Sequence, residues 1–143
     1  MVNAYFDTSV LVTLTLQEAR WPTLFSWIVA TMPRPYYSDF GWGEYISAVG
    51  LNVRRGELDA AAAQGTIAEI DDYLNSWTRL HVRRSDLVSA AEMLKVFRLG
   101  LRFPDAIHIA IARRKRLTLV SADHKQLAAA RHFGVNAVSP YES

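Results

Sequence analysis

Short apolar runs alternate with helical segments along the whole chain, and this alternation restricts the fold more than any other feature. Runs at residues 2–6, 36–38, 80–82 and 117–120 have the length of buried strands, and residues 135–138 suit a last edge strand. Helical spacing of apolar residues fills the gaps, at about 10–16, 21–32, 39–55, 57–77, 85–98, 104–115 and 123–133. Strands separated by helices predict an α/β sandwich around a mainly parallel sheet.

Glycine and proline residues mark the predicted element boundaries. Gly56, Gly100 and Gly134 each follow a helical segment, where glycine commonly ends a helix. Pro33 and Pro35 separate the second helix from the second strand. Further boundary signals are the first-turn prolines Pro22 and Pro104 and the capping pair Ser85–Asp86.

Length and composition predict one soluble domain. The 143 residues are enough for one compact domain with a real core, and half of them are apolar. No apolar run approaches the ~20 residues that cross a bilayer, and the N-terminus lacks a basic-then-apolar signal pattern. The absence of cysteine excludes disulfides, thiolate nucleophiles and cysteine-ligated zinc. We therefore expect a cytoplasmic protein without membrane contact.

The basic residues are mostly arginine and occur in clusters. Thirteen of the sixteen cations are Arg, and they group at Arg54–Arg55, Arg83–Arg84 and Arg113–Arg116. Arginine binds phosphate through a planar fork, so these clusters favour an anionic polymer as substrate or partner. Solvated helix faces are the alternative explanation for each cluster. Trp21, Trp27, Trp42 and Tyr45 have the helical spacing of core or interface aromatics, and base stacking is their alternative role.

Four acidic residues occupy positions that face a common edge of the predicted sheet. Asp7 follows the first strand and Asp123 follows the strand at 117–120, while Asp105 comes directly after Pro104. Glu44 interrupts an otherwise aromatic and apolar helix. In parallel sheets, functional groups gather beyond the carboxyl ends of the strands. Carboxylates gathered there repel one another unless a cation lies among them, which predicts a divalent metal site with oxygen ligands.

Three of these acids also have a structural explanation. Asp7 suits a helix N-cap, Asp105 lies in a first helical turn, and Asp123 has the capping-box spacing to Gln126. Glu44 lies beyond the first turn of its helix, so capping does not explain it, and an unpaired charge there would be costly. Ser9 and Ser121 are placed to hydrogen-bond a carboxylate or a metal-bound water, or to form turns.

The order and neighbours of the four acids resemble the PIN-domain family, and within it the VapC toxins of VapBC toxin–antitoxin modules. The resemblance rests on Tyr5–Ser9, Glu44, Phe103–Ala110 and Ser121–Asp123, and it extends over essentially the whole chain. It implies a single PIN-like domain over residues 1–143, folded as a three-layer α/β/α sandwich. It also implies a Mg²⁺- or Mn²⁺-dependent endoribonuclease that cleaves an RNA substrate.

The same resemblance implies a homodimer inhibited by a cognate antitoxin protein, for which a hydrophobic groove among the first helices is a candidate seat. Asp7, Glu44, Asp105 and Asp123 are carried over as the catalytic, metal-binding quartet. Ser121 stands where many members have Thr, which keeps a hydroxyl. His124 and Lys125 follow the last aspartate, where some members have another acid, so a second metal site would have few ligands.

Within this quartet we expect Asp7 and Asp105 to hold the main ion, and Glu44 and Asp123 to orient waters or complete a second site. A metal-free reaction through His108 is the competing chemistry, although a histidine on an apolar helix is more often a packed residue. The Arg113–Arg116 cluster is the leading candidate for RNA binding.

Two other classes of protein compete with a nuclease as an explanation of this sequence. A phosphoaspartyl phosphatase would need a second acid where this chain has Ser9. A non-catalytic PIN-like module that binds RNA or protein is the main rival function.

Overall fold

A fully parallel five-stranded sheet forms the centre of the computed structural model, which describes residues 1–142 apart from the side chain of Glu18. Ser143, the last residue of the predicted domain, lies outside the described residues. The strand order is β3-β2-β1-β4-β5, and all four pairings are parallel. The strands are β1 (Asn3–Phe6), β2 (Arg34–Ser38), β3 (Thr78–Leu80), β4 (Thr118–Val120) and β5 (Ala137–Val138).

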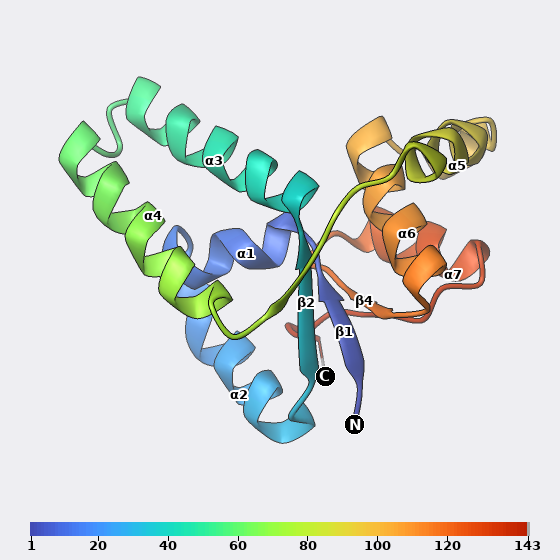
Figure 1. Cartoon of the computed structure of the whole chain (residues 1–143), viewed down its shortest axis with the longest axis horizontal. Coiled ribbons are helices and arrows are strands. Elements are labelled where there is room, and N and C mark those ends of the chain that lie inside the picture. The colour runs from blue at the N-terminus through green and yellow to red at the C-terminus, as the bar shows by residue number, and fades with distance from the viewer. Residues whose placement is uncertain (143) are drawn as a thin grey trace.

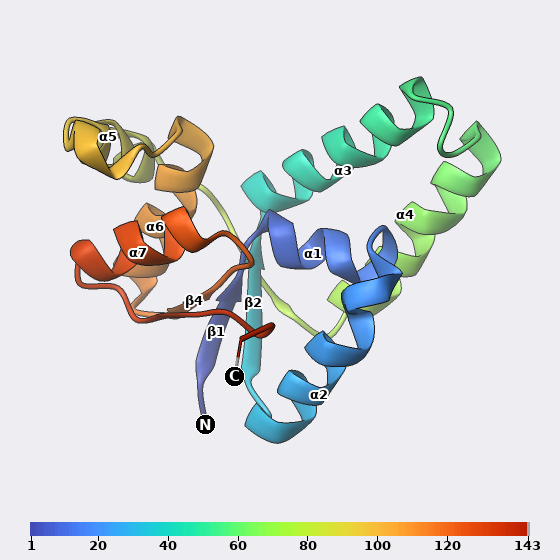
Figure 2. The ribbon, with the colours of Figure 1, turned by 180° about the vertical axis from the view of Figure 1, so that it is seen from behind.

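Helices cover both faces of this sheet, which confirms the predicted α/β sandwich (Figures 1 and 2). One layer contains α1 (Thr8–Thr15), α2 (Trp21–Thr31), α3 (Asp39–Arg54) and α4 (Ala60–Leu74). The opposite layer contains α5 (Arg84–Leu94), α6 (Phe103–Lys115) and α7 (His124–His132). Two short 3₁₀ turns, η1 (Glu18–Arg20) and η2 (Phe97–Leu99), precede α2 and α6. No helix in residues 1–142 combines the length and the apolar character needed to span a bilayer.

Alternating residues of the central strand divide the core into two parts. Ala4 and Phe6 of β1 pack against α1–α4, whereas Tyr5 packs against α6 and α7. Because successive side chains of a strand point to opposite faces, a continuous apolar strand is the pattern expected when both faces are covered. In β4, Leu119 faces the same side as its partner Tyr5, and Val120 the same side as Phe6.

Several predicted boundaries are wrong by a few residues, for identifiable reasons. Strand β2 begins at Arg34 and includes Pro35, which was expected to lie between the second helix and a strand at 36–38. Proline is tolerated there because the pairing with β3 begins only at Tyr36, so no partner on that side needs an N–H from residue 35. Strand β3 lies at Thr78–Leu80, two residues before the predicted run, and pairs with β2 from Thr78 onward.

Capping contacts determine where α4 and α5 begin. Helix α4 begins at Ala60 because the Asp59 side chain accepts a hydrogen bond from the Ala62 N–H at 2.7 Å. Helix α5 ends at Leu94, and the predicted continuation forms η2. Asp86 contributes to the start of α5, as predicted, but from the third helical position, where it accepts from the Arg83 N–H at 2.8 Å.

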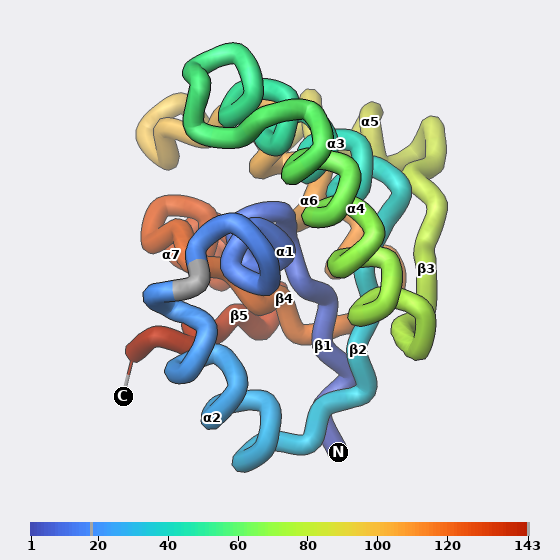
Figure 3. The backbone as a smooth tube through the Cα atoms, turned by 90° about the vertical axis from the view of Figure 1, so that its left-hand side faces the viewer, coloured from blue at the N-terminus to red at the C-terminus, as the bar shows by residue number. Residues whose placement is uncertain are grey.

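The carboxyl ends of the strands form the edge at which helices begin. Helices α1 and α3 start directly after β1 and β2, on the side away from the two chain ends (Figures 1 and 3). The chain proceeds from β1 through β2 to β3 in one direction, and then returns to place β4 and β5 on the other side of β1. This reversal between β1 and β4 is the kind of position where parallel α/β sheets bind ligands.

Candidate active site

The four predicted acids all lie at this carboxyl edge. Asp7 directly follows β1, Asp123 precedes α7 after β4, Glu44 is in the second turn of α3, and Asp105 is in the first turn of α6. Pairing of β1 with β4 aligns Phe6 with Val120, so the loops that carry Asp7 and Asp123 leave the sheet side by side.

Hydrogen bonds join these loops and the start of α6. The Ser9 hydroxyl accepts from the Ala122 N–H at 3.0 Å, and it lies 3.4 Å from the Ser121 hydroxyl. The Gln126 side-chain amide donates to the Asp105 carbonyl oxygen at 3.3 Å. Segments from the two ends of the sequence therefore form one connected surface.

Asp7 is nearly enclosed, with 3% of its surface exposed. Its Oδ1 accepts from the Ser9 hydroxyl at 2.5 Å and from the Val10 N–H at 3.3 Å, so it caps α1 as the structural explanation predicted. Burial raises the pKa of Asp7, and the nearby His108 ring and the hydroxyls of Ser121 and Ser9 only partly oppose this rise. The predicted contact of a serine hydroxyl with a carboxylate is confirmed for Ser9 at Asp7, whereas the Ser121 hydroxyl donates to Gln126 Oε1 at 3.1 Å.

Glu44 has the partner that its position in an apolar helix requires. Its Oε1 accepts from the Thr8 hydroxyl at 2.5 Å and from Nε2 of His108 at 2.5 Å. Burial raises the pKa of Glu44, but the hydrogen bond and charge interaction with His108, the Thr8 hydroxyl and the Arg102 charge outweigh it, so the pKa is lowered overall. Glu44 is therefore held ionised at this edge.

Asp105 and Asp123 lie close enough to repel each other. Oδ2 of Asp105 accepts from the Arg102 N–H at 3.3 Å, and the Arg102 guanidinium lies 3.7 Å from it. Burial raises the pKa of Asp105, and the negative charge of Asp123 adds to this rise. Asp123 caps α7, and its Oδ1 accepts from the Lys125 and Gln126 N–H groups at 3.0 and 3.3 Å.

A divalent cation fits the chemistry of this donor set without a preformed cage. Within residues 1–142, no group of three or more acidic or histidine side chains is spaced to enclose an ion. The four carboxylates are hard oxygen donors, and Mg²⁺ keeps several waters that can bridge to such ligands. A cation there would also offset the repulsion and burial that raise the pKa values of Asp7 and Asp105.

The basic cluster at the end of α6 lies away from the acids. Arg113–Arg116 occupy the last turn of α6 and the residue after it, whereas Asp105 is in the first turn. Arg114 is committed to a paired contact with buried Asp86, with Nε–Oδ1 at 2.8 Å and a terminal nitrogen 2.9 Å from Oδ2. Arg102 beside Asp105 and Lys125 next to Asp123 are cations at the acidic edge, and the Lys125 ammonium lies close to the backbone of Gly100.

The aromatic residues take the packing roles predicted for them. Tyr45 is fully buried and its hydroxyl hydrogen-bonds the Thr15 hydroxyl, while Trp42 stacks on it with ring centroids 5.8 Å apart. Trp27 packs against the core on the α1–α4 side. Trp21 stacks on Phe25 of α2, with centroids 4.9 Å apart.

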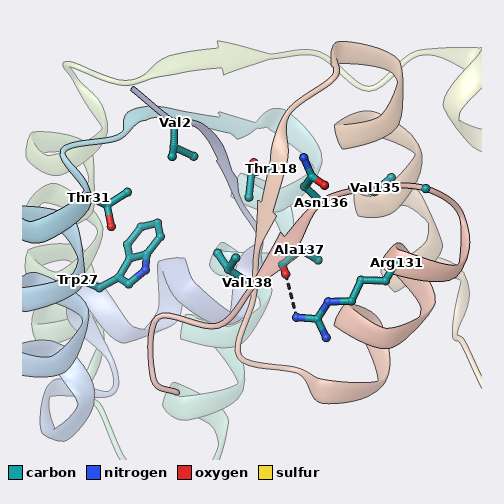
Figure 4. A pocket seen from close by; sticks show the side chains of 10 residues that line it. Val2, Trp27, Thr31, Thr118, Arg131, Val135, Asn136, Ala137 and Val138 are labelled. Atoms are coloured by element: carbon teal, nitrogen blue, oxygen red, sulfur yellow. Dashed lines mark hydrogen bonds between the residues drawn. The ribbon is translucent and has the colours of Figure 1, made fainter. Parts of the chain in front are cut away.

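A cavity of about 700 Å³ lies at the opposite edge of the sheet (Figure 4). It is lined by residues around the amino ends of β1, β4 and β5, among them Val2, Thr118 and Asn136. None of its lining residues is acidic, and the Arg131 guanidinium points to the Ala137 carbonyl oxygen, to which it donates at 2.8 Å. This cavity is therefore separate from the candidate active site.

Three side chains of the site were missed by the sequence prediction: Tyr5, Thr8 and Ser38. The Tyr5 hydroxyl lies 2.6 Å from Nδ1 of His108 and 2.7 Å from the Ser38 hydroxyl. A tyrosine within an apolar strand next to the strand-end aspartate was the available signal, because a buried tyrosine hydroxyl needs a partner.

Comparison with known proteins agrees with this arrangement. The PIN domain family model matches residues 4–132, which include all four acids. The chain belongs to the PIN domain family. This membership and the parallel sheet with helices on both faces confirm the predicted family and its α/β/α fold. No curated protein is similar to this PIN-domain chain at the level of sequence.

Solved structures share the fold over nearly the whole length. VapBC-1 from nontypeable Haemophilus influenzae matches with a TM-score of 0.72 and 12% identity, over 99% of this chain and 100% of the other. VapC20 from Mycobacterium tuberculosis, a sarcin–ricin loop cleaving toxin, has a TM-score of 0.69 and 22% identity, over 89% and 95% of the two chains. PAE2754 from Pyrobaculum aerophilum has a TM-score of 0.64 and 24% identity, over 97% and 91%. At these identities the likeness establishes the fold alone.

Proposed function

We propose that this PIN-domain protein is a toxin that cleaves RNA as a divalent-metal-dependent endoribonuclease and is neutralised by a cognate antitoxin. The observation that carries the proposal is the meeting of Asp7, Glu44, Asp105 and Asp123 at the carboxyl edge of the sheet, where the strand order reverses. The solved structure of VapC20, a sarcin–ricin loop cleaving toxin, supports a cleavage reaction on this fold.

Asp7 and Asp105 would hold the main ion, because both are partly or fully shielded from water and have raised pKa values that a cation would lower. When bound, Mg²⁺ or Mn²⁺ supplies an acidified water and neutralises charge on the phosphate. Glu44 is anionic and held by Thr8 and His108 through Oε1, so Oε2 is available to take the proton of the attacking water. Asp123 would orient a second water beside Asp105.

Cations at the rim of the site would bind the RNA backbone. The Arg102 side chain is 81% exposed and lies beside Asp105, and Lys125 follows Asp123 at the start of α7. Their positive charges would attract the phosphate that the acids alone would repel.

An apolar groove in the layer formed by α1–α4 is a suitable binding surface for the antitoxin. A groove of about 210 Å³ between α2 and α4 is lined largely by aromatic and proline side chains, among them Phe25, Tyr73 and Trp77. Phe25 and Val29 of α2 are 50% and 57% exposed. A toxin–antitoxin complex from Klebsiella pneumoniae contains this fold, with a TM-score of 0.66 and 21% identity to this chain. We assign the groove to an amphipathic antitoxin segment and expect a homodimer in solution.

One observation favours a rival function, a non-catalytic PIN-like module that binds RNA or protein. Each of the four acids already accepts a hydrogen bond from the protein, so the cluster does not depend on an ion to be folded. Repulsion between Asp105 and Asp123 argues against this rival, because without a bound cation it would destabilise the fold and contribute nothing to function.

The deciding experiment is incubation of the purified protein with total cellular RNA and Mn²⁺, followed by mapping of the cleaved ends. Asp7→Asn and Asp105→Asn should abolish cleavage while the protein stays folded. Asp59→Asn is the matched control, since Asp59 caps α4 and Asn can keep that cap. Near-wild-type cleavage by either site variant, or an absence of both metal binding and cleavage in the wild type, would refute the proposal.

A further inference from the structure

His108 occupies a closed position behind Glu44. It lies on α6, one turn after Asp105, and is 3% exposed. Its ring packs against Tyr5 and Phe40, with centroids 5.6 and 5.2 Å away. A Cβ added at Gly41 would lie 3.4 Å from the ring carbon Cε1, an ordinary van der Waals contact, so the first turn of α3 passes close to the ring. The imidazole is therefore held in one orientation.

Both ring nitrogens of His108 are engaged by other side chains. Nε2 lies 2.5 Å from Oε1 of Glu44, which also accepts from the Thr8 hydroxyl. Nδ1 lies 2.6 Å from the Tyr5 hydroxyl, which lies 2.7 Å from the Ser38 hydroxyl. The Ser38 oxygen in turn accepts from the Gly41 N–H at 3.0 Å. The bonds form one continuous chain from the backbone of α3 to Glu44.

The chemistry of the two ends, together with the need of each hydroxyl hydrogen for an acceptor, gives the direction of every bond in this chain. A carboxylate only accepts, so Nε2 carries the hydrogen that Glu44 receives, and a backbone N–H only donates, so the Ser38 oxygen accepts from Gly41. The Ser38 oxygen could accept a second hydrogen, but the Ser38 hydroxyl hydrogen finds an acceptor in this chain of bonds only at Tyr5, so Ser38 donates to Tyr5 and Tyr5 donates to Nδ1. In this arrangement every donor has an acceptor, and no buried side-chain nitrogen or oxygen in the described residues lacks a partner. A hydrogen on Nδ1 would reverse Tyr5 and leave the Ser38 hydroxyl hydrogen without an acceptor in the chain.

We propose that Tyr5 and His108 are positioning residues for Glu44: together they fix the Nε2–H tautomer and hold Oε1, so that Oε2 faces the reacting water. The inference deepens the proposed function and rests on it. It also separates His108 from a general acid or base that acts on RNA, because the ring is buried and both of its nitrogens are occupied within the protein. His108 touches the reaction only through Glu44.

Paired substitutions at Tyr5 and His108 test the idea by their effect on kcat. Tyr5→Phe removes only the hydroxyl that fixes the tautomer, and we expect a fall in kcat of about tenfold with KM unchanged, because small misplacements of catalytic groups are costly. Tyr45→Phe is the matched control. Tyr45 is also fully buried with a hydrogen-bonded hydroxyl, but it contacts Thr15 outside this chain, so its loss should leave kcat unchanged at a similar cost in stability.

At His108 itself, Leu and Gln substitutions differ in the donor they offer to Glu44. His108→Leu should lower kcat by about a hundredfold. His108→Gln, whose amide N–H can donate to Glu44, should retain at least about a tenth of the wild-type kcat. If Leu and Gln variants are equally impaired, or if Tyr5→Phe and Tyr45→Phe have the same kcat, the positioning role is wrong.

A measurement without metal or RNA keeps the inference separate from the proposed nuclease activity. Nitrogen-15 NMR of the metal-free wild type should show His108 with its hydrogen on Nε2 and a bare Nδ1, and Tyr5→Phe should give a mixture of the two tautomers. A wild-type ring with its hydrogen on Nδ1 would overturn the assignment, even in a protein that cleaves RNA. Conversely, an inactive wild type with the expected tautomer would refute the nuclease and leave the hydrogen-bond chain standing.

Discussion

The contact between Arg114 and Asp86 gives a prediction whose size follows from the structure. Asp86 is 1% exposed at the start of α5. The Arg114 guanidinium of α6 donates to both of its carboxylate oxygens, from Nε to Oδ1 at 2.8 Å and from Nη2 to Oδ2 at 2.9 Å. The same guanidinium donates to the His81 carbonyl oxygen at 3.1 Å. Arg114→Met would leave the carboxylate buried with the Arg83 N–H as its remaining donor. Removing one partner of a buried ion pair costs about 3–5 kcal/mol.

That cost is a large part of the ~5–15 kcal/mol by which a domain of this kind is stable. Equilibrium unfolding in urea should therefore show a much lower midpoint for Arg114→Met, with an unchanged slope. The adjacent, exposed Arg113→Met is the control and should stay within about 0.5 kcal/mol of the wild type.

The double variant Asp86→Asn/Arg114→Met should recover much of the loss, because no unpaired charge is then buried. A loss below about 1 kcal/mol for Arg114→Met, or an equal loss for Arg113→Met, would show that this contact does not hold α5 against α6.

Three further predictions concern the candidate active site at the carboxyl edge of the sheet. Mn²⁺ at a hundred times its Kd should stabilise the protein by about 2.7 kcal/mol, and Asp105→Asn should lose most of this gain; equal melting temperatures with Mn²⁺ and with EDTA would exclude the metal site. In metal-free urea titrations, the free energy of unfolding should fall as pH rises from the unfolded Asp pKa of 3.8 through the raised pKa of folded Asp7, because the native state keeps this proton to a higher pH. Asp7→Asn should reduce this dependence of stability on pH. A dependence unchanged by Asp7→Asn would contradict the argument that burial raises the pKa of Asp7. Arg102→Gln or Lys125→Gln should each reduce the salt slope of RNA binding by about one, and Arg113→Gln by less; the reverse order would move the RNA to the far end of α6.

The sequence was most informative for features that a short segment determines by itself, such as a buried strand and the acid that follows it. Apolar runs predicted the strands, and because parallel strands end at one edge, the acids after β1 and β4 were correctly expected to lie together. Partner choice between distant elements was not predictable. Glu44 is hydrogen-bonded by a histidine on α6, sixty-four residues later, and Arg114 differs from its neighbours because α5 brings Asp86 to it. Such pairings depend on how helices dock, which no short pattern encodes.

The pairing of β1 with β4 also sets when the protein can become active during its synthesis. Phe6 aligns with Val120, so the strand that is made first waits for one made more than a hundred residues later. Until β4 pairs with β1, the Ser121 hydroxyl is not yet beside Asp7, and Asp123 is not yet held at the carboxyl edge of the sheet. A nascent chain emerging from the ribosome at about 5–20 residues per second would thus stay inert for several seconds. For the proposed RNA-cleaving toxin, this order of assembly would delay cleavage until β4 has been made and would leave time for the proposed antitoxin to bind.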